Sequence, residues 1–211
     1  MNRLNVEYYN VSSRYFVGEV MYIEGRYITI VLYPDKYYGL GLSTPLYIVS
    51  DECGIIAISV SNVTRAKYGK EFALVRRNVE EDISRLYPDL KSHYNYIIKA
   101  YNLYNVSKDG VIHRKRGCNP TPHDPVFILD KEDVKKLFFN SSFNNHLLWI
   151  LARENPDPML FREILYSIKE ISNDYDKSRL LKEMLSSLHS AGYKELEIFI
   201  RDFKEVFIDE E

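Results

Sequence analysis

The residues with the greatest chemical potential lie close together in one short stretch of the chain. His113, Cys118 and His123, with Asp124 beside the last, are side chains that bind metal ions or transfer protons. Zinc sites typically pair their ligands about two to four residues apart, whereas these three are each five residues apart. The stretch therefore has two interpretations: a dispersed enzyme site, metal-dependent or not, or a solvated proline-rich loop.

A second group of residues is basic. Arg114, Lys115 and Arg116 follow one another, and Arg76 and Arg77 lie earlier in the same part of the chain. Alternation along a strand would place Arg114 and Arg116 on one face and Lys115 on the other. Such cations contact nucleic-acid phosphates or an acidic protein partner. The alternative is an edge strand whose charges prevent unwanted pairing.

Sequence motifs of common enzyme families are missing. The chain has no P-loop, no G-x-G-x-x-G, no G-x-S-x-G and no H-E-x-x-H pattern. The nearest fragment to a P-loop is residues 68–70, which lacks the first glycine and the hydroxyl that binds the metal ion. We therefore expect a protein without a cofactor and without catalytic machinery of its own.

Composition limits the class of protein. The 211 residues carry a formal net charge of −2, which argues against a protein that coats nucleic acid but permits one basic patch. Tyrosine is frequent, with 18 residues against 10 Phe and 1 Trp. Tyrosine suits half-buried strands and contact surfaces, although a compositional bias of the lineage explains the count equally well.

The two cysteines, Cys53 and Cys118, are too few for a disulfide scaffold. The first ten residues lack the apolar core of a signal peptide, and no apolar run is long enough for a membrane span. From these observations we expect a cytoplasmic protein that does not contact a membrane.

The first two thirds of the chain favour β-structure. Runs rich in β-branched and aromatic residues, separated by Gly, Pro and Asp turns, are typical of a barrel. Residues 24–25 are the predicted turn of the first hairpin, and residues 79–93 form a predicted helix with a break. The predicted strands are residues 15–23, 26–33, 45–50, 55–63, 71–77, 96–104, 111–116 and 126–129.

The last third favours helices. A helix with acidic residues in its first turn is predicted to begin at residues 130–133. Apolar residues then recur at helical spacing within residues 161–168, 181–188 and 196–206, after a further helix at residues 144–154. Gly192 is the predicted C-cap of the helix before it. Short connections between such stripes are typical of a small helical bundle.

Four segments resemble the HAS barrel, the domain that begins HerA-type DNA-translocating ATPases. They are residues 17–20 (VGEV), 58–65 (ISVSNVTR), 119–126 (NPTPHDPV) and 132–137 (EDVKKL), and the resemblance covers residues 14–140. In that family a RecA-like motor with a P-loop follows the barrel, whereas here helices follow. The resemblance therefore implies a docking or assembly module of DNA-processing machinery, without the motor and without a catalytic residue to carry over.

Together these observations predict an α+β protein. Residues 1–140 form a small β-barrel with one or two inserted helices, and residues 141–211 form a small all-α domain of about four helices. The expected function is a non-catalytic adaptor that binds a protein partner such as a HerA-like ATPase or its nuclease, and that can self-assemble. The alternatives are a nucleic-acid-binding barrel that uses the basic residues and tyrosines, and an enzyme with a dispersed site around His113, Cys118 and His123.

Overall fold

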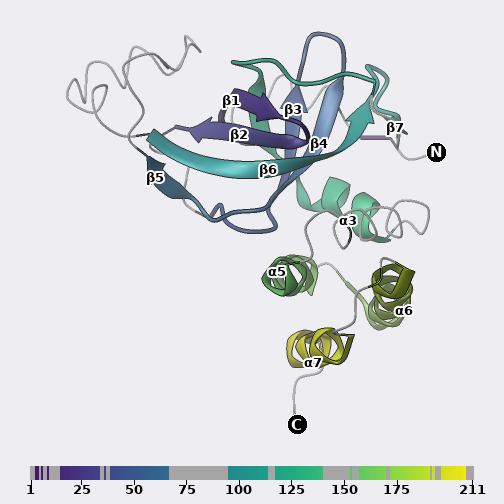
Figure 1. Ribbon diagram of the computed structural model, residues 1–211. Helices are drawn as coiled ribbons and strands as arrows, with labels where there is room; N and C mark the ends of the chain where they lie inside the picture. The colour runs from purple at the N-terminus through teal and green to yellow at the C-terminus, as the bar shows by residue number, and fades with distance from the viewer. Residues whose placement is uncertain are drawn as a thin grey trace. The chain divides into compact units, whose positions relative to one another are not determined.

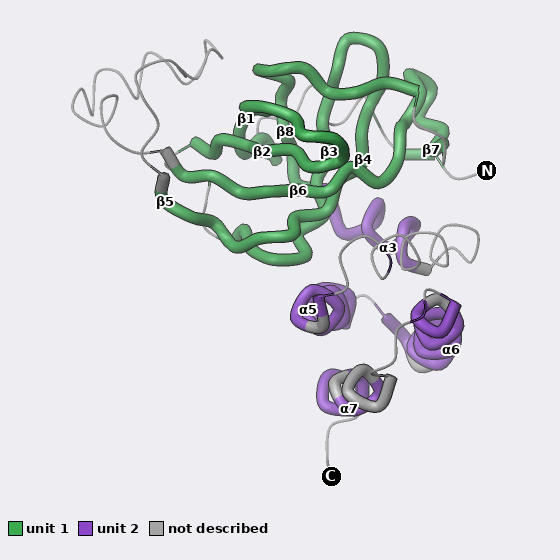
Figure 2. The backbone as a smooth tube through the Cα atoms, in the orientation of Figure 1, with its two compact units in different colours: residues 1–128 green, residues 129–211 purple. Residues whose placement is uncertain are grey.

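The structure is a computed structural model with two compact units, residues 1–128 and 129–211 (Figure 2). The residues that the structure describes are 3–4, 6, 9, 15–33, 36, 39–66, 95–113, 117–139, 153, 157–169, 172–190, 192 and 196–207.

The first unit contains a closed, six-stranded antiparallel barrel (Figure 1). The strands described in this unit are β1 (Phe16–Glu24), β2 (Tyr27–Leu32), β3 (Pro45–Val49), β4 (Gly54–Ser59), β5 (Thr64–Ala66), β6 (Asn95–Val106), β7 (Ile112–His113) and β8 (Pro125–Ile128). The barrel closes in the order β1, β2, β6, β4, β3, β8 and back to β1. The short strands β5 and β7 pair with β6 outside this ring.

Strand β6 allows the ring to close because it is long enough to pair with two different strands. Its first half pairs with β2 and its second half with β4. The pairing with β4 contains a bulge, because Ile56 pairs with Tyr104 whereas the next residue, Ala57, pairs with Asn102. Bulges bend a strand and increase its twist, which a small barrel requires. A further irregularity in β1 lies beside Gly18, where a Cβ atom would collide with the carbonyl oxygen of Val31.

The barrel interior is filled by alternate residues of the six strands, as the period of two along a strand requires. Isoleucine, valine, leucine and alanine dominate it, so the centre is a packed core and not a channel. The buried members are Val17, Val20, Ile28, Ile30, Leu32, Leu46, Ile48, Ile55, Ala57, Ile98, Ala100 and Val126.

Aromatic side chains cover part of the outer surface of the barrel. Phe16 lies with its ring centroid 5.0 Å from that of Tyr33 and 5.5 Å from that of Phe127. Tyr9, from the N-terminal segment, lies 4.9 Å from Tyr47 and 6.1 Å from Phe127. All five rings are buried, so the barrel has an apolar layer on its outside as well as inside, and part of the high tyrosine count serves packing.

The second unit contains four described helices longer than one turn: α3 (Lys131–Phe139), α5 (Pro158–Lys169), α6 (Asp174–Ser190) and α7 (Leu196–Phe207). Helix α3 contacts α5 and α6, and α7 contacts both α5 and α6. The predicted apolar stripe on α5 is buried at Phe161, Ile164, Leu165 and Ile168, whereas the stripe on α6 is buried at Met184 and Leu188 and half-buried at Leu181 and Leu185. No described helix combines the length and apolar character that a membrane crossing would need.

The sequence located most of the described elements correctly, with shifts of a few residues at their ends. One turn was misplaced: the first hairpin turns at Gly25 and Arg26, because Glu24 still pairs with Tyr27 and Gly25 has a positive φ of 63°. Gly192 has a φ of 77°, as a C-cap glycine requires. The predicted strand 71–77, helix 79–93 and most of helix 144–154 lie outside the described residues.

Candidate functional site

The basic residues selected from the sequence cannot be placed. Arg76, Arg77, Arg114, Lys115 and Arg116 all lie outside the described residues. Strand β7 ends at His113, directly before the basic run. The basic-strand interpretation therefore remains a prediction.

The His113, Cys118 and His123 set is divided among three different environments. His113 lies beside Ser107, Cys118 is bonded to Cys53, and His123 contacts a buried carboxylate. A cysteine in a disulfide has no thiolate to offer a metal ion, so the structure corrects the idea that Cys118 is a ligand. Within the described part of the chain, no three His, Cys, Asp or Glu side chains lie close enough together to hold a metal ion.

His123 belongs to a buried-carboxylate cluster with Glu19 and Tyr33. Glu19 lies on β1 and is fully buried, and the hydroxyl of Tyr33 donates to its Oε1 at 2.7 Å. The Nδ1 atom of His123 lies 3.1 Å from its Oε2, although 42% of the histidine side chain is exposed. Buried carboxylates require such partners because desolvation is costly. The cluster therefore links the barrel wall to the proline-rich loop.

The turn at residues 121–124 presents this histidine. Asp124 N–H donates to the Thr121 carbonyl oxygen at 3.1 Å, and the Asp124 carboxylate accepts from the Thr121 N–H at 2.7 Å. Pro122 followed by His123, whose φ is +71°, fits a type II turn, where the third residue is usually glycine. Glycine would avoid the backbone strain of this position, and the histidine instead contributes the contact with Glu19.

An open pocket lies where the β3–β4 turn meets the end of β6, and we call it the end pocket. Its volume is about 560 Å³, and the residues that line it are Glu52, Cys53, Asn105, Val106, Ser107, Lys108, His113, Gly117 and Cys118. Two stretches distant in sequence form it, one at residues 52–53 and one between residues 105 and 118. It contains charges of both signs, hydroxyl and amide groups, and the disulfide.

Asn105 and the disulfide hold the wall of the end pocket together. Cys53 and Cys118 are 65 residues apart in sequence and have Cα atoms 6.5 Å apart, a distance within the usual range for a disulfide. Asn105 is buried, donates from Nδ2 to the Cys118 carbonyl oxygen at 3.1 Å, and accepts at Oδ1 from the Gly117 N–H at 2.5 Å. The sequence carried no signal for this pairing, because two cysteines without a recognised motif reveal nothing about their distance.

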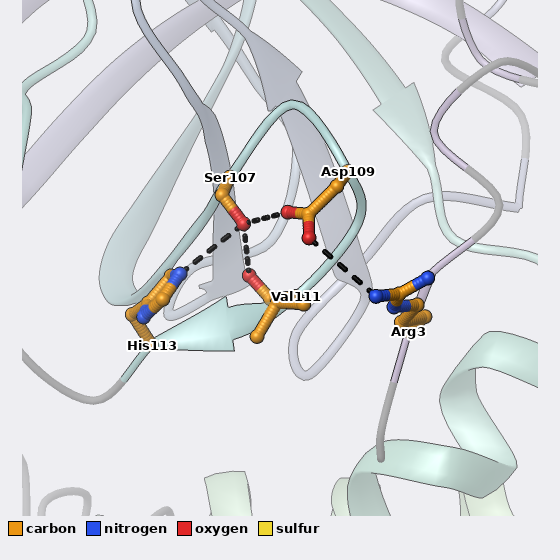
Figure 3. Close-up of polar contacts among 5 residues, drawn as sticks. All are labelled: Arg3, Ser107, Asp109, Val111 and His113. Atoms are coloured by element: carbon orange, nitrogen blue, oxygen red, sulfur yellow. Dashed lines mark hydrogen bonds and ion pairs between the residues drawn. The ribbon is translucent and has the colours of Figure 1, made fainter.

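The rim of the end pocket carries the Ser107 cluster, which consists of Arg3, Ser107, Asp109, Val111 and His113 (Figure 3). The Ser107 hydroxyl contacts the Asp109 carboxylate and lies 3.1 Å from the Val111 carbonyl oxygen. His113 Nε2 lies 3.2 Å from Ser107 Oγ, and Arg3 Nη2 lies 3.7 Å from Asp109 Oδ2. The serine thus lies between the histidine and the aspartate.

This order of groups determines what the Ser107 cluster can do. In a nucleophilic triad the histidine lies between serine and carboxylate and accepts the serine proton. Here the hydroxyl hydrogen bond from Ser107, with smaller help from backbone groups and Arg3, lowers the pKa of Asp109. A carboxylate with a lowered pKa is a poor base, and the contacts of Ser107 with Asp109 and Val111 join the two ends of the turn at residues 107–111.

A third polar region, the outer tyrosine face, lies on the outside of β1, β2 and β6. It comprises Tyr22, Arg26, Tyr27, Lys99 and Tyr101. Tyr22 and Tyr27 are 40% and 39% exposed, and Lys99 is also exposed. The Arg26 guanidinium lies 5.7 Å from the Tyr101 ring centroid and donates to the Tyr101 hydroxyl at 3.2 Å.

The chain was compared with known proteins. It matches no protein-family model, and no curated protein matches it.

Proposed function

We propose that the chain is a non-catalytic adaptor that docks another protein at the end pocket of its barrel. The observation that carries this proposal is the composition of the pocket: the exposed side chains of Glu52, Lys108 and His113 surround peptide groups and the half-buried disulfide. A polypeptide segment offers charges of both signs together with backbone donors and acceptors, so it complements such a surface.

Among the residues that the structure describes, the arrangement of charges favours a protein over a nucleic acid at this pocket. Glu52 lines the pocket, and Asp109 lies on its rim with a lowered pKa, so both repel phosphate groups at neutral pH. Arg3 pairs with Asp109 and thereby reduces the positive charge that it offers to a ligand. Lys108 and His113 remain as exposed groups for an acidic or carbonyl-rich segment.

The resemblance to HAS barrels supports one class of partner. By that resemblance the partner is a HerA-like DNA-translocating ATPase or its associated nuclease, and the barrel acts without a motor of its own. We further propose that residues 141–211 form a separate all-α domain, and that the protein acts in the cytoplasm.

Charge reversal at the end pocket tests the proposal. Lys108→Glu should reduce retention of the protein partner about tenfold in affinity enrichment, since an exposed pocket cation becomes an anion. The matched control is Lys99→Glu, which reverses an exposed lysine on the outer tyrosine face. Equal retention of partners by both variants, or no retention by the unchanged protein, would contradict docking at this pocket.

A second candidate function is nucleic-acid binding through the outer tyrosine face. Exposed tyrosine rings provide stacking surfaces for single-stranded bases, and Arg26 and Lys99 provide cations beside them. The basic residues Arg114, Lys115 and Arg116 remain predicted contacts of this candidate. One acidic residue, Glu24, opposes this candidate, because it pairs with Tyr27 and a negative charge there repels phosphate groups.

This candidate predicts a particular dependence on salt. Affinity for a single-stranded oligonucleotide should fall steeply as the salt concentration rises, and Tyr27→Ala should weaken binding by about 1–3 kcal/mol. The control is Tyr166→Ala, which removes a comparably exposed tyrosine from helix α5. No measurable binding at low salt would exclude the candidate.

A further inference from the structure

The disulfide in the wall of the end pocket is placed for chemistry and not only for stability. Cys53 and Cys118 are each half-buried, and both line the pocket. Both also pack against the core of the barrel, so the disulfide lies between the core and the pocket. Disulfides whose only role is to hold a fold together are usually protected from contact with solutes.

A hydrogen-bond donor is already aimed at both sulfur atoms. The Nδ2 atom of Asn105 lies 3.5 Å from Cys53 Sγ and 3.6 Å from Cys118 Sγ. Asn105 is itself 4% exposed, and its contacts with Gly117 and the Cys118 carbonyl oxygen fix its orientation. A fixed N–H group stabilises a thiolate more than it stabilises a neutral disulfide sulfur, because hydrogen bonds to charged acceptors are stronger.

The pocket also supplies positive charge and a scaffold that does not depend on the disulfide. Lys108 lines it together with Glu52, and a cation close to a thiol favours its thiolate form. Cys53 is held by the β3–β4 hairpin, where Ser50 N–H donates to the Cys53 carbonyl oxygen at 3.0 Å. Cys118 is held by Asn105. We therefore expect both cysteines to stay close to these positions when the sulfur–sulfur bond opens.

From this arrangement we propose that Cys53 and Cys118 form a redox-active pair that exchanges with a low-molecular-mass thiol bound in the end pocket. The thiolate RS⁻ attacks one sulfur, a new RS–S bond forms, the Cys53–Cys118 bond breaks, and the other cysteine leaves as a thiolate stabilised by Asn105 Nδ2–H. A second RS⁻ then attacks the mixed disulfide. It releases RSSR and the second cysteine thiolate, and both cysteine thiolates take up protons from water. Two thiols are oxidised and the cystine is reduced.

The activity does not depend on the docking proposal, because it needs only a small thiol. The test incubates the folded full-length protein with reduced glutathione at millimolar concentration, quenches with iodoacetamide and measures intact mass. We expect a mixed disulfide with one glutathione per chain, followed by two alkylated cysteines, while circular dichroism shows that the fold is retained.

Asn105→Asp separates a thiolate-stabilising role of Asn105 from a merely structural one. The carboxylate keeps an acceptor for the Gly117 N–H but removes the N–H donor, so exchange should slow by about fivefold. Loosening of the pocket would instead speed exchange by exposing the sulfur atoms. As a second variant, Lys108→Gln should slow exchange by about twofold and leave the fold intact.

Three results would overturn the proposal. The first is a protein that resists glutathione while folded and reacts only in denaturant, which would make the disulfide purely structural. The second is a protein purified without reductant whose two cysteines are both free thiols. The third is an Asn105→Asp variant that exchanges as fast as the unchanged protein or faster.

Discussion

The buried-carboxylate cluster and the Ser107 cluster use the same kinds of residue in opposite environments. Each joins a histidine, a hydroxyl group and a carboxylate through short contacts. Glu19 is fully buried and lies on a barrel strand, whereas Asp109 is exposed on a turn. The difference teaches that burial, and not residue type, determines whether such a cluster holds the fold together or remains available at a surface.

The largest effect that this comparison predicts is at Glu19. Glu19→Ala removes the acceptor of Tyr33 and His123 and leaves a cavity, so the free energy of unfolding should fall by about 3 kcal/mol in urea denaturation. Glu52→Ala is the matched control, since Glu52 is an exposed carboxylate on the end pocket, and it should change stability by less than about 0.5 kcal/mol. Similar losses in the free energy of unfolding from both variants would show that the buried carboxylate stabilises the fold no more than the exposed one does.

The Tyr33 hydroxyl should account for part of that loss. Tyr33→Phe removes only the hydrogen bond to Glu19 and should lower the free energy of unfolding by about 1.5–2 kcal/mol. Tyr22→Phe removes a hydroxyl from a tyrosine that is 40% exposed and should have almost no effect. If the two denaturation curves shift equally, the buried hydrogen bond contributes nothing specific.

His123 combines a side-chain contact with an unfavourable backbone conformation. At its φ of +71° glycine is favoured over alanine. His123→Gly should therefore be more stable than His123→Ala by about 1 kcal/mol in thermal denaturation, although both lose the contact with Glu19. Equal stability of the two variants would show that the turn at residues 121–124 changes conformation once the histidine is removed.

The smallest effect concerns the titration of Asp109. The hydrogen bond from Ser107 lowers its pKa below the ordinary value of 3.8. A lowered folded-state pKa contributes stability above the ordinary pKa, and this contribution is lost as the pH falls through the folded-state value. In Ser107→Ala the pKa of Asp109 should rise toward 3.8 in a carboxyl-carbon NMR titration, with little change in stability at neutral pH. An unchanged titration would show that Ser107 does not influence the carboxylate.

The barrel was largely predictable from the sequence, whereas its sites were not. The alternation of residues in segments such as Ile55–Ser59 predicts which side of the strand each residue faces, and Gly25 predicts a hairpin turn. Both predictions succeed because they depend only on neighbouring residues. The contact between Glu19 and His123 joins positions 104 apart, and the Cys53–Cys118 bond joins positions 65 apart. Such distances depend on how six strands close into a ring, which no local pattern encodes.

His123 shows both the use and the limit of residue-type reasoning. The sequence selected it as a possible metal ligand together with Cys118, and it is indeed part of a polar cluster. Its side chain contacts Glu19 and not Cys118, because the type II turn directs the histidine toward β1. The sequence did not indicate Asn105 or Lys108 as site residues, because neither belongs to a recognisable sequence motif.

The central claim, that the end pocket is where the protein meets its partner, is tested most directly by site-specific photo-crosslinking in cells. A photoreactive amino acid at position 108 should crosslink to a protein, and the same group at position 99 on the outer tyrosine face should not. Crosslinks from position 99 alone, to protein or to nucleic acid, would contradict the claim and place the binding surface on the outer tyrosine face.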